Sequence, residues 1–312
     1  MGYAVFSWCS CSPILASSST PPRRRRSRCL EFAAYGGFAL YRLAGAAQDN
    51  LFRLVHHDQL ASTNDEGLTR AKEGDPGQLW LVADTQTAGR GRNGRVWSSP
   101  KGNLHASLLL INPAPPRRAA ELGFVAGVAT GHALREIFCG DRRVTIKWPN
   151  DVLHDGAKVC GILLESANLP DGRFACVVGV GVNCRLHPAN TPYKATNLSA
   201  IAGRPVAPER VFAQLSATMT HWLDVWAAGA GFESIRAEWL SLATGLGTSI
   251  GVARHSQMIE GTFQTIDTTG RLMLEQPSGQ VAIEAGDVFF SPRAALPPPG
   301  DRNSAYRPRD AT

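Results

Sequence analysis

The hydrophobic pattern of this chain changes abruptly near Thr248, and this change constrains the fold more than any other feature. Before Thr248, apolar runs of strand length alternate with segments of helical spacing, namely Ala119–Phe138, Glu209–Trp226 and Phe232–Leu242. From Thr248 to Ser291 only short alternating runs occur, separated by Gly-containing turns. The pattern predicts a mixed α and β domain over residues 49–246 and a small β-barrel over residues 247–292.

The strand candidates of the first region follow one another with short connections. Leu79–Asp84 and Leu104–Ile111 are nearly continuous apolar runs, which is typical of buried strands. Three more candidates are Val144–Trp148, Lys158–Glu165 and Phe174–Asn183, and turn-forming residues separate them. Because short connections favour antiparallel neighbours, we expect antiparallel pairing among these strands.

The chain is basic, with a formal net charge of +6, but the excess lies at its two ends. Six arginines stand against one glutamate in residues 1–48, and four arginines stand against two aspartates from Arg293 onward. The body between them is close to neutral, which argues against a broad surface for DNA phosphates. No pair of amphipathic helices with a short Gly-containing turn precedes Ser62, so we expect no helix-turn-helix head.

The two ends do not have the composition of packed domains. Residues 1–48 are rich in Ser, Ala and Arg, which is compatible with an organellar transit segment, a disordered tail or an over-long translated start. Residues 293–312 are rich in Pro and Arg, and we expect a disordered tail. No apolar stretch approaches the roughly 20 residues of a membrane span. We therefore expect a cytoplasmic protein without membrane contact.

The cysteines give no sign of a structural metal site. No CxxC pair occurs among the four cysteines of the central region, which are Cys139, Cys160, Cys176 and Cys184. All four have apolar neighbours in the sequence, so we expect them to be buried in a reducing compartment.

The most informative segment is Ala88–Trp97, in which glycines and arginines alternate directly after a predicted buried strand. The glycines allow the backbone to wrap around a ligand, and the guanidinium groups match phosphate or carboxylate oxygens. Trp97 adds an apolar surface beside them. A solvated flexible loop is the alternative for an isolated repeat of this kind.

A second polar cluster begins where a predicted strand ends, at Lys147-Trp148-Pro149-Asn150-Asp151. A Pro-Asn-Asp turn is common by itself, but it does not account for Lys147 and Trp148. Lys158 follows at the start of the next apolar run, and the chain has only five lysines. A lysine at a strand end can simply extend to solvent, so the position alone does not assign a role.

Two further segments have both a structural and a functional interpretation. Ser62-Thr63-Asn64 precedes a predicted helix, and Thr63-x-x-Glu66 fits a capping box, yet hydroxyls at a helix start also bind urea-like groups. Val178–Asn183 is a strand with Gly179 and Gly181 on one face. These glycines leave room for a flat ligand, for another backbone or for a bulge.

Taken in order, these motifs resemble the catalytic module of biotin protein ligases. The resemblance covers residues 51–291 and depends above all on the arginine loop and the Lys-Trp-Pro-Asn-Asp turn. It implies an α+β fold, with a class II synthetase-like mixed-sheet catalytic domain and a C-terminal SH3-like β-barrel. One departure is Asn93, where many members of the family have another arginine. The absence of a recognisable DNA-binding head implies the monofunctional type.

The resemblance also implies a role for individual residues. Biotin would be bound by Ser62, Thr63, Asn64, Gln86, Arg90, Gly91, Arg92, Lys158, Gly161, Gly179 and Gly181. ATP would be bound by Arg92, Arg95, Trp97, Lys147, Asn150, Asp151 and Asn183, of which Asn150, Asp151 and Asn183 would also hold Mg²⁺. The catalytic residues would be Lys158, Arg90 and Arg92.

The reaction implied by the resemblance has two steps. Biotin would attack the α-phosphorus of ATP to give biotinyl-5'-AMP, and a lysine of an acceptor would then attack the mixed anhydride. The acceptor would be the biotin carboxyl carrier protein of acetyl-CoA carboxylase or of a related biotin-dependent carboxylase, and a homodimer is possible. Two alternatives are a lipoate or octanoate ligase or transferase, and a non-enzymatic ligand-binding or nucleic-acid-binding regulator suggested only by the basic ends.

Overall fold

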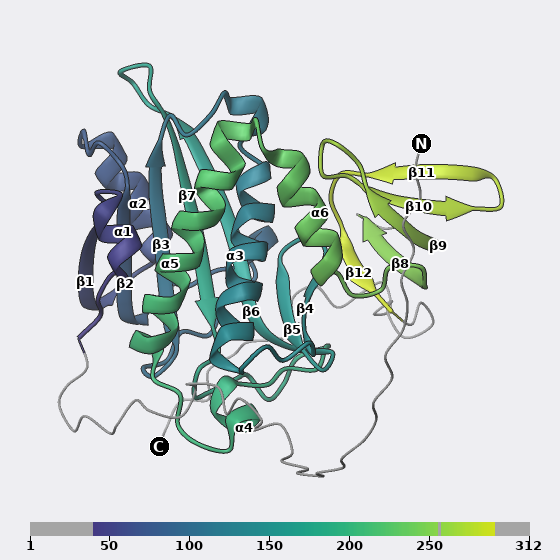
Figure 1. Cartoon of the computed structure of the whole chain (residues 1–312), viewed down its shortest axis with the longest axis horizontal. Coiled ribbons are helices and arrows are strands. Elements are labelled where there is room, and N and C mark those ends of the chain that lie inside the picture. Colours follow the sequence, from purple (N-terminus) through teal and green to yellow (C-terminus); the bar gives the residue numbers. More distant parts are fainter. Residues whose placement is uncertain (1–39, 255–256, 291–312) are drawn as a thin grey trace, which may run out of the picture. The chain divides into compact units, whose positions relative to one another are not determined.

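The computed structural model describes residues 40–254 and 257–290, and Figure 1 labels their helices and strands. In chain order these are α1 (Gly45–Asp49), β1 (Arg53–Leu60), α2 (Thr63–Lys72), β2 (Leu79–Gln86), β3 (Leu104–Ile111), α3 (Glu121–Ile137), β4 (Val144–Lys147), β5 (Asp151–His154), β6 (Ala157–Asn168), β7 (Phe174–Val182), α4 (Leu198–Ala202), α5 (Pro208–Trp226), α6 (Phe232–Leu242), β8 (Ser249–Arg254), β9 (Gln257–Ile266), β10 (Leu272–Gln276), β11 (Gly279–Ile283) and β12 (Asp287–Phe289).

The larger sheet is mixed, with seven strands in the order β1-β2-β3-β7-β6-β5-β4. β1 pairs with β2 in parallel, and every other neighbouring pair is antiparallel, which confirms the pairing that the short connections predicted. Two strands had not been predicted. β1 contains Arg53, His56 and Asp58, as is usual for an edge strand. β5 is only four residues long, and the sequence analysis placed its first residue, Asp151, in a turn.

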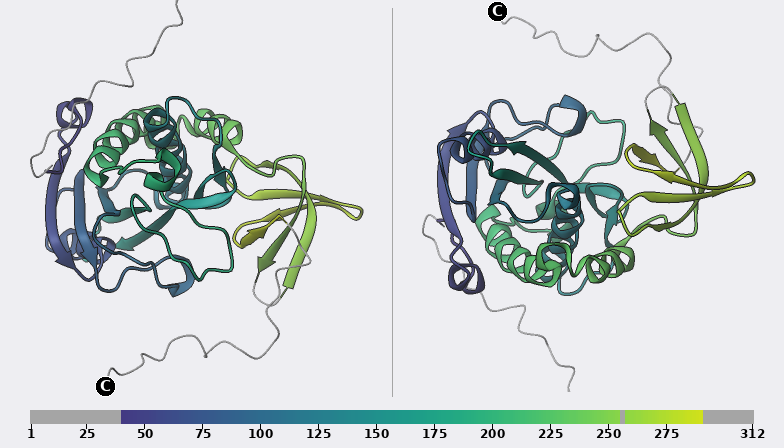
Figure 2. Two further views of the ribbon diagram at one scale, coloured as in Figure 1. Left: turned by 90° about the horizontal axis from the view of Figure 1, so that it is seen from below. Right: turned by 90° about the horizontal axis from the view of Figure 1, so that it is seen from above.

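Helices cover the two faces of this sheet unequally. α3 and α5 cross one face together, with α6 beside α3, as Figure 1 and the two further views in Figure 2 show. The main hydrophobic core lies under these helices. α2 packs on the other face over a smaller cluster that includes Leu81, Leu109 and Val177. Because β3 and β7 are buried on both faces, they have nearly continuous apolar sequences.

The packed body begins before residue 49, earlier than the composition suggested. Tyr41 is buried, and its ring centroid lies 5.0 Å from that of His56 and 5.8 Å from that of Phe212. Ala47, in the short helix α1, is also fully buried. The acid-poor composition of the preceding segment concealed these apolar contacts. Most of the expected N-terminal extension and the expected C-terminal tail lie outside the described residues.

The second sheet is wholly antiparallel, with five strands in the order β11-β10-β9-β8-β12. Its interior contains Ile250, Phe263 and Leu272, each at most 2% exposed. It is connected to the larger sheet by Trp148, whose indole Nε1 donates a 3.2 Å hydrogen bond to the carbonyl oxygen of Gly270. The change of pattern near Thr248 thus coincides with the start of a separate sheet.

Two further expectations were that the four central cysteines are buried and that no segment spans a membrane. Cys160, Cys176 and Cys184 are buried, and burial raises the pKa of Cys176 to about 11 and that of Cys184 to about 12. Cys139 is exposed, contrary to the prediction, and it lies just after Phe138, the C-cap residue of α3. Within residues 40–254 and 257–290, no helix combines the length and the apolar character needed to cross a bilayer.

Candidate active site

A cavity of about 590 Å³ lies against the sheet on the side of α2 and is bordered by the loop after β2. All but one of the predicted site residues line it: Ser62, Thr63, Asn64, Gln86, Arg90, Gly91, Arg92, Arg95, Trp97, Lys147, Asn150, Asp151, Lys158, Gly161, Gly179 and Gly181. The exception is Asn183. Its side chain is buried and donates a 3.1 Å hydrogen bond to the carbonyl oxygen of Thr196, so the structure does not bring it to the cavity.

One end of the cavity is a network of neutral hydrogen bonds at the start of α2. The backbone N–H of Thr63 donates to Gln86 Oε1 at 2.8 Å, and the Thr63 hydroxyl donates to the same oxygen at 3.1 Å. Ser107 Oγ lies 2.6 Å from both Thr63 Oγ1 and Asn64 Oδ1. Gln86 Nε2 donates to Ser99 Oγ at 2.8 Å. These groups fix one another, so their positions are set before any ligand binds.

The cap of α2 differs from the predicted capping box. Ser62 is the N-cap residue, and its hydroxyl accepts from the backbone N–H of Asp65 at 3.4 Å. Thr63 is the first helical residue, so its hydroxyl takes no part in the cap and binds Gln86 instead. The local sequence did not distinguish two adjacent hydroxyl residues as N-cap, because both types are favoured there.

The floor of the cavity consists of glycines that lie opposite one another in the sheet. Gly161 of β6 pairs with Gly181 of β7, and Gly179 lies two residues earlier on the same face. A Cβ atom on Gly181 would lie 2.5 Å from Trp97 Nε1, and one on Gly161 would lie 2.9 Å from Trp97 Cζ3. In this structure the indole of Trp97, a flat group, lies directly over these two glycines.

The other end of the cavity gathers cations. Lys158 Nζ lies 2.6 Å from Asp151 Oδ1, and it also lies 5.4 Å from the centroid of the Trp97 ring. Lys147 Nζ lies 5.9 Å from the centroid of Phe289, which belongs to β12. Burial lowers the pKa of Lys147, and this effect outweighs the attraction of Asp151. Strand ends of the two sheets therefore converge on a positively charged region.

The arginine loop is a hairpin whose tip is exposed to solvent, with Val96 90% exposed. Its two arms are joined by hydrogen bonds from the N–H of Gly91 to the carbonyl oxygen of Arg95, at 2.7 Å, and from the N–H of Trp97 to that of Gly89, at 2.9 Å. At its tip Asn93 has φ 58°, a left-handed conformation that asparagine tolerates better than arginine does. The departure from the family pattern at Asn93 thus has a backbone explanation.

The three arginines of this hairpin have different partners. Arg90 binds Asp65 and Glu165, whereas Arg92 Nη1 donates to Asn150 Oδ1 at 3.3 Å. The guanidinium of Arg92 also donates to the carbonyl oxygen of Gly286, at 3.3 Å, and Arg95 Nη2 donates to both carboxylate oxygens of Asp287 at 2.8 Å. Arg90 therefore faces α2 and β6, whereas Arg92 and Arg95 both reach residues 286–287 at the second sheet.

Several residues at the cavity were not predicted from the sequence. His105 of β3 lines the cavity, and Ser107, two residues later, contacts Thr63 and Asn64 from behind the lining. Their polarity within an apolar strand was a signal that was available. Burial lowers the pKa of His105, which favours its neutral form. Tyr193 and residues 287–289 also line the cavity, and no local pattern marked them, because only the fold brings them there.

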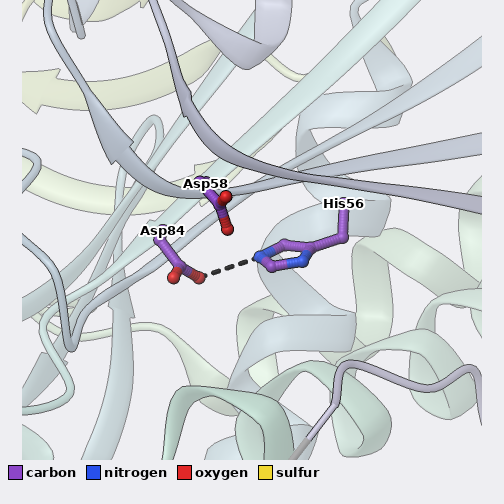
Figure 3. Close-up of side chains that lie close together, drawn as sticks. All are labelled: His56, Asp58 and Asp84. Atoms are coloured by element: carbon purple, nitrogen blue, oxygen red, sulfur yellow. Dashed lines mark hydrogen bonds and ion pairs between the residues drawn. The ribbon is translucent and has the colours of Figure 1, made fainter.

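A separate polar group at the edge of the larger sheet does not border the cavity. His56 and Asp58 of β1 and Asp84 of β2 point toward one another, as Figure 3 shows, and they are the one group in the described part of the chain with the spacing of a metal site. His56 Nε2 lies 2.9 Å from Asp84 Oδ1, and Lys101 Nζ lies 2.9 Å from Asp84 Oδ2. Asp84 is thus already balanced by two basic side chains.

Comparison with known proteins agrees with this geometry. Residues 59–183 match the biotin/lipoate A/B protein ligase family, and residues 246–291 match the biotin protein ligase C terminal domain. The biotin–[acetyl-CoA-carboxylase] ligase of Paracoccus denitrificans is 40% identical over 240 residues, which are 73% of this chain and 97% of that protein. The chain belongs to the biotin protein ligase family.

Other members of the family support the fold over the same region. The bifunctional ligase/repressor BirA of Bacillus subtilis is 33% identical over 75% of this chain and 73% of its own length. The solved biotin protein ligase of Aquifex aeolicus, in complex with biotin and ATP, superposes with a TM-score of 0.65 at 29% identity, covering 76% of this chain and 97% of that one. The predicted α+β class, with a second sheet at the C-terminal end, is confirmed.

Proposed function

We propose that this biotin protein ligase activates biotin with ATP to give biotinyl-5'-AMP and transfers the biotinyl group to a lysine of a biotin carboxyl carrier protein. The observation that carries this proposal is a single cavity whose one end is neutral and hydrogen-bonding while the other end is cationic. A ureido ring needs neutral donors and acceptors, and an adenylated carboxylate needs positive charge.

The neutral end supports a role in binding the ureido ring for Ser62, Thr63, Asn64 and Gln86. Their hydroxyl and amide groups offer both donors and acceptors to a ring that carries two N–H groups and one carbonyl. Gly161, Gly179 and Gly181 would form the floor under biotin. Of the residues predicted for ATP, Asn183 is withdrawn, because its side chain points to Thr196 and not to the cavity.

In the first step the biotin carboxylate attacks the α-phosphorus of ATP. A carbon–oxygen–phosphorus linkage forms, the bond to the bridging oxygen breaks, and pyrophosphate leaves with its electron pair. Lys158 and Arg92 line the cavity beside the expected position of this phosphorus, and they would stabilise the charge that develops on its oxygens. The reaction needs no covalent enzyme intermediate, so positioning and electrostatics carry the catalysis.

The donor set also fits Mg²⁺, which prefers oxygen ligands. The Asp151 carboxylate lines the cavity and is 19% exposed, with one oxygen bound by Lys158. Asp151 would hold the ion, and Asn150 would contribute little, because its Oδ1 accepts from Arg92 and its Nδ2 donates to Ile162. When bound, Mg²⁺ would neutralise charge on the departing pyrophosphate.

In the second step the amine of the acceptor lysine attacks the carbonyl carbon of biotinyl-5'-AMP. An amide bond forms, the bond from that carbon to the phosphate oxygen breaks, AMP leaves with the electron pair, and the amine nitrogen releases a proton to solvent. The mixed anhydride must be kept from water until the lysine arrives. Trp97 and the hairpin that precedes it border the cavity and would provide this shield.

Cytoplasmic location and a possible homodimer stay predictions.

Mass spectrometry of an acceptor tests the proposal directly. The full chain is incubated with biotin, Mg-ATP and the carrier domain of an acetyl-CoA carboxylase. We expect one biotinyl group on the carrier, and none on a carrier whose target lysine is replaced by arginine. Modification by lipoate in place of biotin would refute the assignment and favour the related lipoate ligases.

A further inference from the structure

Arg90 differs from the other arginines of the hairpin because carboxylates surround it. Its Nη1 donates to Asp65 Oδ2 at 2.6 Å and its Nη2 donates to Asp65 Oδ1 at 2.5 Å. The same Nη2 lies 3.0 Å from both carboxylate oxygens of Glu165, and Nε lies 3.3 Å from Glu165 Oε1. Two acids therefore bind one guanidinium in the bidentate geometry that gives strong pairs.

This arrangement leaves Arg90 poorly suited to bind an anion itself. Two negative charges stand against its single positive charge, so the local balance is negative. All three nitrogen atoms of its guanidinium are engaged, and its side chain is 28% exposed. A phosphate or carboxylate brought to this position would meet two carboxylates at close range, which is unfavourable.

Glu165 extends the contact from the hairpin to the neutral end of the cavity. Its Oε2 accepts from Asn64 Nδ2 at 2.7 Å, and Asn64 Oδ1 in turn lies 2.6 Å from Ser107 Oγ. Asp65 is the next residue of α2. The start of α2, the far part of β6 and the base of the hairpin are thus joined through one pair of acids.

We propose that Asp65 and Glu165 are positioning residues, which hold Arg90 as the anchor of the hairpin so that Arg92 and Trp97 stay over the bound adenylate. This inference rests on the proposed function and deepens it. It reassigns Arg90, which the sequence analysis placed on the ligand, to a structural contact within the site. Through this anchor, the position of the hairpin is coupled to the hydrogen-bond network that would bind the ureido ring.

The direct-contact alternative makes the opposite prediction for variants of the acids. If Arg90 binds the ligand itself, Asp65→Asn and Glu165→Gln release it from competing carboxylates, and the ligand is held as well as before or better. If the acids position Arg90, the same variants weaken the anchor and behave like Arg90→Gln. Both substitutions keep side-chain size, and Gln at 165 can still accept from Asn64.

The measurement is the rate at which preformed biotinyl-5'-AMP leaves the full-length protein. We expect Asp65→Asn with Glu165→Gln to accelerate release about tenfold, as loss of a charge-assisted pair commonly does. Adding Arg90→Gln to this double variant should cause no further acceleration. Asp171→Asn is the matched control, because it breaks an ion pair of 2.7 Å with Arg173 at the β6–β7 turn.

Trypsin gives a second readout that a general loss of stability would not mimic. The hairpin contains three arginines, and we expect faster cleavage there in the acid variants at unchanged melting temperature. If the double variant fails to fold, the release rate of Asp65→Asn alone tests the proposal. The Asp65 side chain is 50% exposed, so this single substitution should not prevent folding. Wild-type release rates in both acid variants, with faster release only in Arg90→Gln, would overturn the proposal. Failure of the wild-type protein to form biotinyl-5'-AMP would instead refute the proposed function.

Discussion

The two ends of the cavity differ in their physical character. At the neutral end, Thr63, Gln86 and Ser107 are hydrogen-bonded to one another, and Thr63 is only 4% exposed. At the cationic end, Lys147 and Lys158 are partly buried, and the Asp151 carboxylate lies 2.6 Å from Lys158 Nζ. A buried neutral network discriminates by shape and by complete pairing, whereas a cationic region discriminates by charge. The two ends should therefore respond differently to substitution, salt and pH.

The largest expected effect comes from the cationic end. Lys158→Ala removes the cation beside the reacting phosphate, and we expect the single-turnover rate of adenylate formation to fall about 10²–10³-fold, the usual cost of losing one such group. Biotin affinity should change much less. Rapid-quench measurement of biotinyl-5'-AMP gives the rate, and a normal rate in this variant would contradict the role of Lys158.

Lys101→Ala is the matched control for this experiment. Lys101 also pairs with an aspartate, at 2.9 Å, but its side chain is 78% exposed and does not line the cavity. Its removal should leave adenylation unchanged. A similar loss in both variants would mean that overall charge, and not the position of Lys158, determines the rate.

A smaller effect is expected at the neutral end. Thr63→Val keeps the shape of the side chain but removes the hydroxyl that lies between Gln86 and Ser107. Leaving buried polar groups unpaired costs about 1–3 kcal/mol, so the KM for biotin should rise roughly tenfold or more while the KM for ATP stays the same. Steady-state kinetics with each substrate varied would show the split, and equal rises would remove the distinction between the ends.

The smallest effect is a pH dependence confined to one end. Burial lowers the pKa of Lys147, so this lysine loses its proton at a lower pH than an exposed lysine does. As the pH rises through that lowered pKa, the KM for ATP should rise a few-fold, whereas the affinity for biotin should stay level. Lys147→Arg keeps the charge and should flatten the profile. A profile unchanged by that substitution would exclude Lys147 as its source.

The sequence predicted the content of the site better than its internal organisation. The Gly and Arg residues at 89–95 and the turn at 147–151 marked the cavity, because few structural roles need those residue types together. The partner of each arginine side chain could not be predicted in the same way. Arg90 and Arg92 are chemically identical and two residues apart, and only the positions of Asp65 and Glu165 distinguish them.

Elements of low apolar content were the hardest to predict. β1 has a polar edge sequence, and β5 is short and follows a Pro-Asn turn, so neither had a clear periodic signal. Residues 287–289 lie far along the chain from every other residue of the cavity, of which Tyr193 is the nearest in sequence, and their contribution depends on how β12 reaches Arg95. Such long-range contacts leave no local trace in the sequence.

Pyrophosphate release from Mg-ATP tests the central claim most directly, because it requires both ends of the cavity to be filled at once. The full-length protein is assayed with biotin, with lipoate and with no acid. The two-ended cavity predicts release that depends on biotin and remains at the background level with lipoate. Release that is equal with lipoate, or independent of any acid, would contradict it.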